Sequence, residues 1–400
     1  MRLFPARPLT SGLLAFAITL ALSATGNAAA ATEEWVFVGT HGPAPAAPTG
    51  EAPNPIDKAT QGIYLTRLDL KTGALAAPIV AYELHHATFL IRHPTLPIIY
   101  AVAEDAGSQE DTDLFSFKVD KVNERLVLLN KVDSGGHGAA ALALDESTGT
   151  LLAAHYVSGS VSALSLKEDG SLGAVISSQA ETGSGPSPRQ KSAHAHDVVI
   201  APDHRFALVS DLGADRIFIY RINPTTRALS PAKIPSETLP AGSGPRHLAF
   251  HPNGKYVLVD SELTAELRSY KWLARTGRLA PVQVVQAYPA GQAGDKSAAE
   301  LALSKDGRFA YVSLRGDQNS LVVYSVDANR GTLMEIQRIA AGGKTPWSFG
   351  IDPTGHYLLV ANEGSNSVAV LSVDADSGRL STTGQSVTVP RPVSVVFSGQ

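Results

Sequence analysis

Seven short polar turns, each followed by a leucine, recur along this chain of 400 residues at nearly constant spacing. The turn segments read KTGAL, NERL, DGSL, TTRAL, TGRL, RGTL and SGRL, and their leucines are Leu75, Leu126, Leu172, Leu229, Leu279, Leu333 and Leu380. Successive leucines are 46 to 57 residues apart. Repeats of this length are typical of propeller blades, whose four antiparallel strands bury their faces only by stacking around an axis. The repeat therefore predicts a seven-bladed propeller.

Upstream of each leucine, two apolar strands flank a tight turn. The pattern is clearest in HLAFHPNGKYVLVDSE, residues 247–262, and in WSFGIDPTGHYLLVANE, residues 347–363. Pro-Asn-Gly and Pro-Thr-Gly favour tight turns because proline presets φ and glycine accepts positive φ. We name the four strands of each blade A to D in chain order. Strands A and B form this hairpin, and the leucine begins strand D.

The two ends of the chain supply complementary halves of one blade. The last A strand, residues 393–397, has no B strand after it, and residues 33–40, EEWVFVGT, form a B strand with no A strand before it. Pairing them would close the ring and remove its open edges. We therefore predict an all-β, seven-bladed β-propeller with four-stranded antiparallel blades, closed by the N- and C-terminal strands. A β-sandwich whose turns happen to be evenly spaced is the alternative. A helical fold is not expected, because no long stretch of the chain shows helical periodicity.

The first residues have the pattern of a secretory signal. Arg2 and Arg7 precede an apolar run over residues 12–24, and Ala28-Ala29-Ala30 offers a cleavage site of small residues. We interpret residues 1–30 as a cleavable signal peptide and residues 31–400 as a single propeller domain. An uncleaved anchor is the alternative, but the run is short for a membrane span. The mature protein is expected in the periplasm or outside the cell, with no stable membrane anchor.

Composition excludes several functions. The chain has no cysteine, so it can form no disulfide and has no thiol nucleophile, and its net charge of −4 without a basic stripe argues against nucleic acid as a partner. It has no G-x-S-x-G elbow and no H-E-x-x-H zinc motif. His194 and His196 could bind a metal, but spacing fixes no third ligand. We expect no metal, no cofactor and a monomer.

The direction of the strands predicts which side chains meet. Because A and B are antiparallel and joined by a short turn, the start of A lies beside the end of B in every blade. Residues at these positions should surround the mouth of the channel at one face, as a hydrolytic or anion-binding site requires. They are His41, His85, His86, Glu104, His137, His155, His194, His196, Asp211, Arg246, His247, Glu262, Glu300, Arg315, Trp347, Glu363 and Arg391. The other four histidines, His93, His204, His251 and His356, fall in turns at the opposite face.

Several of these segments resemble the seven-bladed lactonase family, which includes the propeller-type 6-phosphogluconolactonases and the fungal carboxy-muconate cycloisomerase. The resemblance rests on His-Ala-His at 194–196, Gly-Pro-Arg-His at 244–247 and Arg-Gly at 315–316, and it extends to the ending VTVPRPVSVVF. It implies a hydrolase that opens a sugar-type or related lactone. A non-enzymatic, exported binding propeller is the alternative, because LLVANEGSNSVAVLSVD, residues 358–374, also resembles YVTN-type repeats.

The resemblance implies catalytic roles for four mouth residues: His196 as acid or base, and Arg246, Glu262 and Arg315. The arginines would hold an anionic substituent and stabilise an oxyanion, while the histidine or carboxylate removes a proton from water. A structural ion pair is the alternative for Arg246 and Glu262. Five further mouth residues are assigned to substrate binding, the first of them in a supporting position: His194, His247, Asp211, Glu300 and Trp347.

Some positions depart from the family pattern. Ala141 and Ala302 stand where histidines are common, and Trp347 replaces a frequent arginine. These differences leave open whether a phosphate group is recognised and which lactone is the substrate. Residues 41–61, a Pro/Ala-rich insertion between a B and a C strand, are expected to form either a flap over the mouth or an inert loop.

Overall fold

The computed structural model describes Met1 and residues 32–42, 61–103, 113–289, 291–292 and 294–399. Residues 2–30 of the predicted signal peptide, most of the Pro/Ala-rich insertion and Glu104 lie outside the described residues, so the expectations for them stay predictions. The chain divides into two compact units, Met1–Ala31 and Thr32–Gln400, and the following description concerns the second. Within the described part of the chain, no helix is long and apolar enough to cross a membrane.

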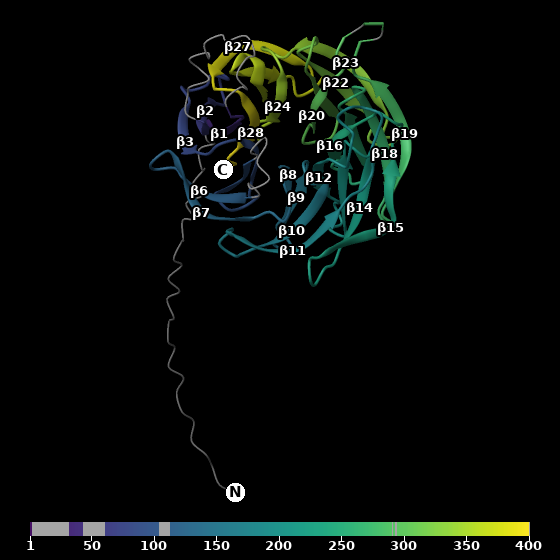
Figure 1. Ribbon diagram of the computed structural model, residues 1–400. Helices are drawn as coiled ribbons and strands as arrows, with labels where there is room; N and C mark the ends of the chain where they lie inside the picture. Colours follow the sequence, from purple (N-terminus) through teal and green to yellow (C-terminus); the bar gives the residue numbers. More distant parts are fainter. Residues whose placement is uncertain (2–31, 43–60, 104–112, 290, 293, 400) are drawn as a thin grey trace, which may run out of the picture. The chain divides into compact units, whose positions relative to one another are not determined.

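The second unit consists of seven four-stranded antiparallel sheets, which form the blades of a propeller (Figure 1). The first blade has the strand order β28-β1-β2-β3, so the C-terminal strand lies beside the N-terminal one, as predicted. Its strands are β28 (Pro392–Phe397), β1 (Glu33–Thr40), β2 (Gly62–Asp69) and β3 (Ile79–Glu83).

The other six blades each take four consecutive strands. Blade two contains β4 (Ala87–Arg92), β5 (Ile98–Ala103), β6 (Asp113–Asp120) and β7 (Arg125–Asp133). Blade three contains β8 (Ala139–Asp145), β9 (Thr150–His155), β10 (Ser160–Leu166) and β11 (Leu172–Ala180). Blade four contains β12 (Ala195–Ile200), β13 (Phe206–Asp211), β14 (Arg216–Ile222) and β15 (Leu229–Thr238). Blade five contains β16 (Pro245–Phe250), β17 (Tyr256–Ser261), β18 (Glu266–Leu273) and β19 (Arg278–Gln286). Blade six contains β20 (Ala298–Leu303), β21 (Phe309–Leu314), β22 (Ser320–Val326) and β23 (Leu333–Ala340). Blade seven contains β24 (Pro346–Ile351), β25 (Tyr357–Asn362), β26 (Ser367–Val373) and β27 (Leu380–Thr388). A 3₁₀ turn, η2 (Glu363–Ser365), follows β25.

The innermost strands contact one another in the order β28, β4, β8, β12, β16, β20, β24 and back to β28, which closes the ring. The described residues form seven buried hydrophobic clusters, and each cluster joins two neighbouring blades. Between blades five and six, for example, Leu258 and Leu267 pack with Val312 and Leu314, all four fully buried. The core therefore lies between the blades, as the repeat length predicts.

The recurring turn before each leucine has a packing role. Gly277 and Gly378 have positive φ values of 65° and 68°, and a Cβ on either would overlap the ring of Phe206 or Phe309 in the preceding blade. Glycine is the residue that accepts both the left-handed backbone and the close approach. These turns therefore pack one blade against an aromatic side chain of the preceding blade.

Leu75 differs from the other six leucines. The others lie at or next to the start of a D strand, but Leu75 makes an isolated bridge to Leu68, and β3 begins only at Ile79. Pro78 stands immediately before β3 and has no N–H to donate to a ladder. The predicted start of this strand was therefore four residues too early.

Candidate active site

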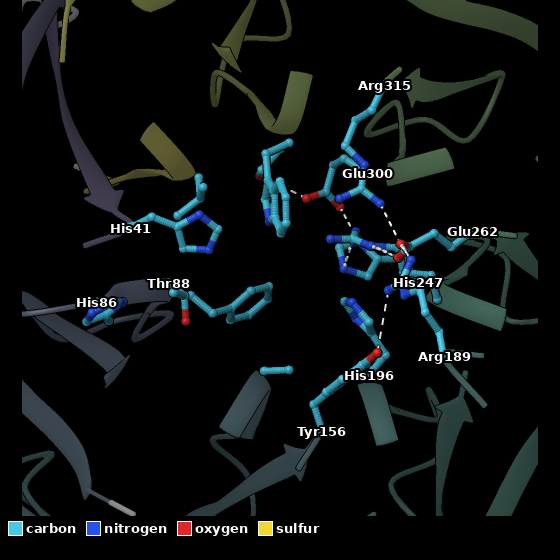
Figure 2. A pocket seen from close by; sticks show the side chains of 16 residues that line it. His41, His86, Thr88, Tyr156, Arg189, His196, His247, Glu262, Glu300 and Arg315 are labelled. Atoms are coloured by element: carbon cyan, nitrogen blue, oxygen red, sulfur yellow. Dashed lines mark hydrogen bonds and ion pairs between the residues drawn. The ribbon is translucent and has the colours of Figure 1, made fainter. Parts of the chain in front are cut away.

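A pocket of about 240 Å³ opens at the predicted mouth of the channel (Figure 2). Its volume is below the roughly 300–1,000 Å³ of drug-sized ligand sites, so it suits one small molecule. All seven blades contribute to its wall. The lining residues are His41, His86, Thr88, Phe89, Ala140, Tyr156, Arg189, His196, Arg246, His247, Glu262, Glu300, Arg315, Trp347, Ser348 and Val393.

A β-bulge at the start of each innermost strand positions much of this wall. In all seven inner hairpins the pairing shifts register at the mouth end of strand A. An extra residue in one strand re-aims its side chain out of the regular alternation, and bulges are common beside active sites for this reason. The re-aimed positions are Thr88, Ala140, His196, Arg246, His247, Ala299, Glu300, Trp347 and Val393.

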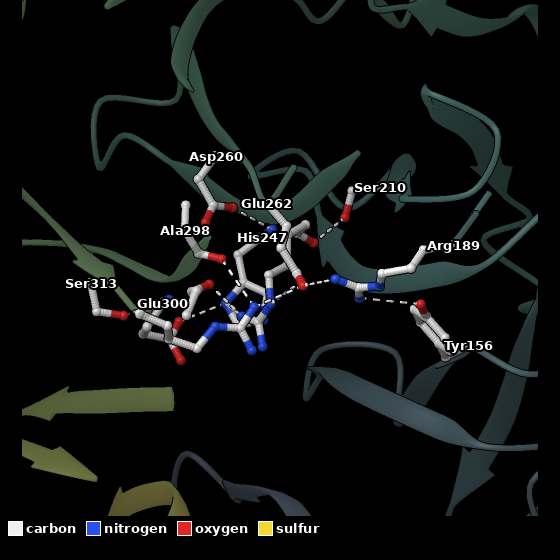
Figure 3. Close-up of polar contacts among 12 residues, drawn as sticks. Tyr156, Arg189, Ser210, His247, Asp260, Glu262, Ala298, Glu300 and Ser313 are labelled. Carbon is white, nitrogen blue, oxygen red and sulfur yellow. Dashed lines mark hydrogen bonds and ion pairs between the residues drawn. The ribbon is translucent and has the colours of Figure 1, made fainter. Parts of the chain in front are cut away.

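Glu262 is the centre of an ion-pair cluster on one wall of the pocket. Its Oε2 accepts a hydrogen bond from Nε of Arg246 at 3.0 Å, and its Oε1 is 2.8 Å from Nη2 of Arg315 and 2.5 Å from Nη1 of Arg189. Figure 3 shows Arg189 reaching Glu262 from one side. Burial alone would raise the pKa of the Glu262 carboxyl, but the three arginines outweigh it and lower the pKa. Glu262 is therefore a carboxylate that holds arginines, and a weak proton acceptor.

The two buried arginines of this cluster are fixed from several directions. Nη1 of Arg246 donates to the carbonyl of Ala299, and Nη2 of Arg315 donates to that of Ala298 at 3.3 Å. Their guanidinium carbons lie 5.9 and 4.5 Å from the ring centre of Trp347. Three cations around one carboxylate leave this wall with excess positive charge, which favours an anionic substituent or a developing oxyanion.

His247 and Glu300 form a second, buried pair beneath the arginines. Nδ1 of His247 is 2.8 Å from Oε1 of Glu300, whose Oε2 accepts from Ser348 at 2.9 Å. Burial lowers the pKa of His247, but the charge and hydrogen bond of Glu300 together with the charge of Asp197 outweigh it, so the net shift is upward. The backbone N–H of His247 donates to Asp260, and burial raises the pKa of that carboxyl to about 7. This network anchors the residues that flank Arg246.

His196 faces the pocket between two other rings. Its ring centre is 5.7 Å from that of Tyr156 and 5.4 Å from that of His247, both in edge-on arrangements. Its Nδ1 is buried and has no hydrogen-bond partner among the described residues. Burial, followed by the positive charge of Arg246, lowers its pKa well below the ordinary value. His196 is therefore a neutral imidazole at physiological pH.

The structure brings seven of the nine predicted site residues to this pocket and leaves two outside it. Asp211 is fully buried, and its Oδ1 accepts from the backbone N–H groups of His194 at 2.8 Å and Ala214 at 2.7 Å. The ring of His194 stacks on Tyr156 at 4.5 Å, and its Nδ1 bonds the carbonyl of Tyr156. His194 precedes β12 and lacks the bulge that turns His196 inward. His194 and Asp211 therefore support the wall and do not line the pocket.

Residues 50–397 match the family model "Lactonase, 7-bladed beta-propeller". The chain belongs to this family. A 6-phosphogluconolactonase of Bacillus subtilis is 31% identical over 341 residues, which cover 85% of this chain and 95% of the relative. A 6-phosphogluconolactonase of Formosa agariphila is also 31% identical, over 80% of this chain and 90% of the relative. The solved periplasmic gluconolactonase of Pseudomonas aeruginosa is 31% identical, with a TM-score of 0.82 over 91% of this chain and 99% of that one. The resemblance inferred from sequence motifs is thus confirmed.

Tyr156 and Arg189 are among the residues of this lactonase-family pocket that sequence reasoning missed. Arg189 stands seven residues before His196, in the loop GSGPSPRQ, beyond the positions that strand direction can place. The adjacent Gln190 is fully buried and fixes the loop, because its Nε2 donates to the carbonyl of Leu212 and to Asp215. One signal could have identified Arg189: it is an arginine in a long loop that leads into an A strand at the mouth.

No group of three metal-binding side chains (His, Cys, Asp or Glu) occurs in the part of the chain that the structure describes. The polar side chains that line the pocket include arginine, carboxylate and imidazole groups around an aromatic ring.

Proposed function

We propose that this lactonase-family protein hydrolyses a sugar-type lactone in the mouth pocket. The observation that carries the proposal is the pair of buried arginines, Arg246 and Arg315, held by the ionised Glu262 at the edge of a small cavity. The relatives named 6-phosphogluconolactonase support the reaction class. The non-enzymatic binding propeller is not favoured, because a scaffold needs no such convergence of charged groups.

The arginines would act on the charge that develops during hydrolysis. When water attacks the lactone carbonyl, its oxygen becomes an oxyanion, and donors already in place stabilise it without reorganisation. Glu262 keeps Arg246 and Arg315 in place and is not itself the base, because its pKa is lowered. His196, as a neutral imidazole, can accept a hydrogen bond from the attacking water or from a hydroxyl group of the substrate.

The pocket also suggests the substrate class. Its volume of about 240 Å³ suits a single lactone ring, and Trp347 offers a flat apolar surface beside the arginines. The surplus of positive charge favours a lactone with an anionic substituent, and Arg189, which is half exposed, is the most accessible cation for it. An activity screen should therefore include both a phosphorylated and a neutral sugar lactone.

Export is part of the proposal. Residues 1–30 have the pattern of a signal peptide, and the similar Pseudomonas aeruginosa structure is that of a periplasmic gluconolactonase. We propose a periplasmic or secreted, monomeric enzyme. Detection of the mature N-terminus in the periplasmic fraction, and a monomer mass by light scattering, would test these two points.

A screen for proton release tests the reaction. The purified protein is mixed with glucono-δ-lactone, 6-phosphogluconolactone and an aliphatic lactone of similar ring size, and acid production is followed against the spontaneous rate. At least one sugar lactone should be opened at a rate proportional to enzyme concentration. A folded protein that accelerates none of them would contradict the proposal.

A further inference from the structure

A second histidine–carboxylate unit lies on the wall of the pocket opposite Glu262. His41 follows β1 directly, and its Nδ1 is 3.1 Å from Oε1 of Glu363, the first residue after β25. Figure 2 shows His41 on the side of the pocket away from Glu262. The ring of Trp347 lies between the two walls, because it contacts His41 at 4.8 Å and the guanidinium of Arg315 at 4.5 Å. One aromatic ring therefore separates this unit from the arginines.

The partners of His41 define its tautomer. An ionised carboxylate only accepts hydrogen bonds, so the Nδ1 of His41 carries the proton that is donated to Glu363. Two arms of Arg391 also donate to Oε1 of Glu363, and the pKa of Glu363 is lowered, because the bonds from His41 and Arg391 outweigh the effect of burial. Nε2 of His41 consequently has the free lone pair. Among the described residues it has no hydrogen-bond partner.

Neither of the family-type acid–base candidates is as well placed to take up a proton. Glu262 is neutralised by three arginines. His196 has no carboxylate partner on its buried Nδ1, and Arg246 and His247 oppose its protonation. A histidine oriented by a carboxylate, with the opposite ring nitrogen open, is the usual arrangement of an efficient general base.

We propose that His41 is the general base of the lactonase reaction and that Glu363 is its positioning residue. This inference rests on the proposed function. Nε2 of His41 takes a proton from the water whose oxygen bonds to the lactone carbonyl carbon, and the carbonyl electron pair moves to its oxygen, beside the arginines. The tetrahedral intermediate then collapses, the ring C–O bond breaks, and the leaving alkoxide takes the proton from the His41 imidazolium. The product is a hydroxy acid, which loses its carboxylic proton to solvent.

The charged and titratable groups around His41 come from three blades. Glu363 and Arg391 belong to the segments after β25 and before β28, and His41 bonds the carbonyl of Arg391 through its backbone N–H at 3.0 Å. His86, before β4, accepts a hydrogen bond from the N–H of Gly42. Glu363 is the only carboxylate that contacts His41 within the described residues, so it is the group that orients the His41 ring.

The test compares His41→Gln with wild type on the best lactone from the screen. Glutamine can keep the contact with Glu363 but cannot take up a proton, so kcat should fall about 10²-fold or more with little change in KM. His85→Gln is the matched control, because His85 is exposed, bonds Gln61 and lies outside the pocket. It should keep the wild-type kcat.

Glu363→Gln provides the second variant. Without the carboxylate, the His41 ring loses the charged acceptor that fixes its orientation and tautomer, so kcat should fall while KM changes little. A structural role alone would lower the melting temperature and leave kcat of the folded variant unchanged. Thermal unfolding checks that each variant is folded, and the kinetics of Glu363→Gln decide alone if His41→Gln does not fold.

The outcomes separate this inference from the proposed function. If the wild type is active and the kcat of His41→Gln is within about threefold of the wild-type value, or the kcat of folded Glu363→Gln is unchanged, the role of His41 is overturned and the lactonase proposal stands. A wild type that opens no lactone overturns both.

Discussion

Histidines at the two faces of the propeller have different environments. His251, in the turn between β16 and β17 at the face opposite the pocket, uses both ring nitrogens: Nδ1 accepts from the N–H of Asn253 at 3.1 Å, and Nε2 bonds the carbonyl of Gly307 in the next blade at 3.0 Å. At the mouth, Nδ1 of His196 has no partner in the described structure. His251 therefore links two turns at one face, whereas His196 lines the pocket with an unpaired ring nitrogen at the other.

Among variants at the two faces, Glu262→Gln should cause the largest loss of stability and activity. Without the carboxylate charge, Arg189, Arg246 and Arg315 repel one another and lose their common acceptor. Breaking a buried ion pair typically costs about 3–5 kcal/mol, so both the free energy of unfolding and kcat/KM should fall, the latter by about 10³-fold. Chemical denaturation and proton release measure the two. A variant with wild-type stability and turnover would show that the ion pairs of Glu262 do not hold the arginines in their active positions.

His196→Ala should remove turnover without removing the fold. A neutral imidazole that bonds water or substrate contributes about 10²-fold to kcat, and its loss leaves the blade interfaces intact. Its unpartnered Nδ1 means that no internal hydrogen bond of that atom is lost. Steady-state kinetics and a thermal melt on one preparation check both points. A variant that melts early but turns over normally would place His196 with the structural histidines.

His251→Ala should show the reverse pattern. It removes one hydrogen bond within its own turn and one to the turn of the next blade, and it leaves the buried carbonyl of Gly307 without that partner, at a cost of about 1–3 kcal/mol. The pocket is at the other face, so kcat/KM below the melting temperature should equal that of wild type. An equal loss of activity in His251→Ala would erase the distinction between the two faces.

Glu181→Gln should give the smallest effect, a change in how the free energy of unfolding depends on pH. Glu181 follows β11 at the mouth face, and burial and the neighbouring Asp211 raise its pKa well above 4.5, while Tyr220 donates to it. A raised pKa in the folded state gives stability that is full below the unfolded pKa and is lost as pH rises through the folded pKa. Wild type should thus lose stability as pH increases above 4.5, by at most about 1.4 kcal/mol per pH unit from this one proton. The glutamine variant should have a flatter profile, and identical slopes would contradict a proton on Glu181.

Much of the fold could be predicted because each blade repeats one local pattern. A short A–B turn, a second hairpin and a leucine after a short polar turn recur, so their spacing indicated the number of blades. The unmatched A and B strands at the two ends of the chain indicated the pairing of the termini. Leu75 was misplaced as a strand start because Pro78 interrupts the ladder, an effect of one residue that the average repeat does not contain.

The site could be predicted where it depends on strand direction, and not where it depends on the path of a loop. Arg246 and Glu262 were placed at the mouth because one hairpin carries both. Arg189 was missed because its position depends on the loop held by Gln190 and Asp215, which no periodicity describes. His194, expected in a supporting position, lies outside the pocket because it precedes β12, and only His196 stands at the bulge that turns a side chain inward.

The most direct test of the central claim, that the arginines of the mouth pocket perform lactone hydrolysis, replaces one arginine at each face. Arg315→Gln changes a buried guanidinium of the pocket, and Arg308→Gln changes one at the opposite face, where Arg308 pairs with Asp306 at 2.6 Å. With the best lactone as substrate, kcat/KM should fall about 10²–10³-fold in Arg315→Gln, the usual loss for one oxyanion donor, and should stay at the wild-type value in Arg308→Gln. Equal kcat/KM in the two variants would contradict the claim.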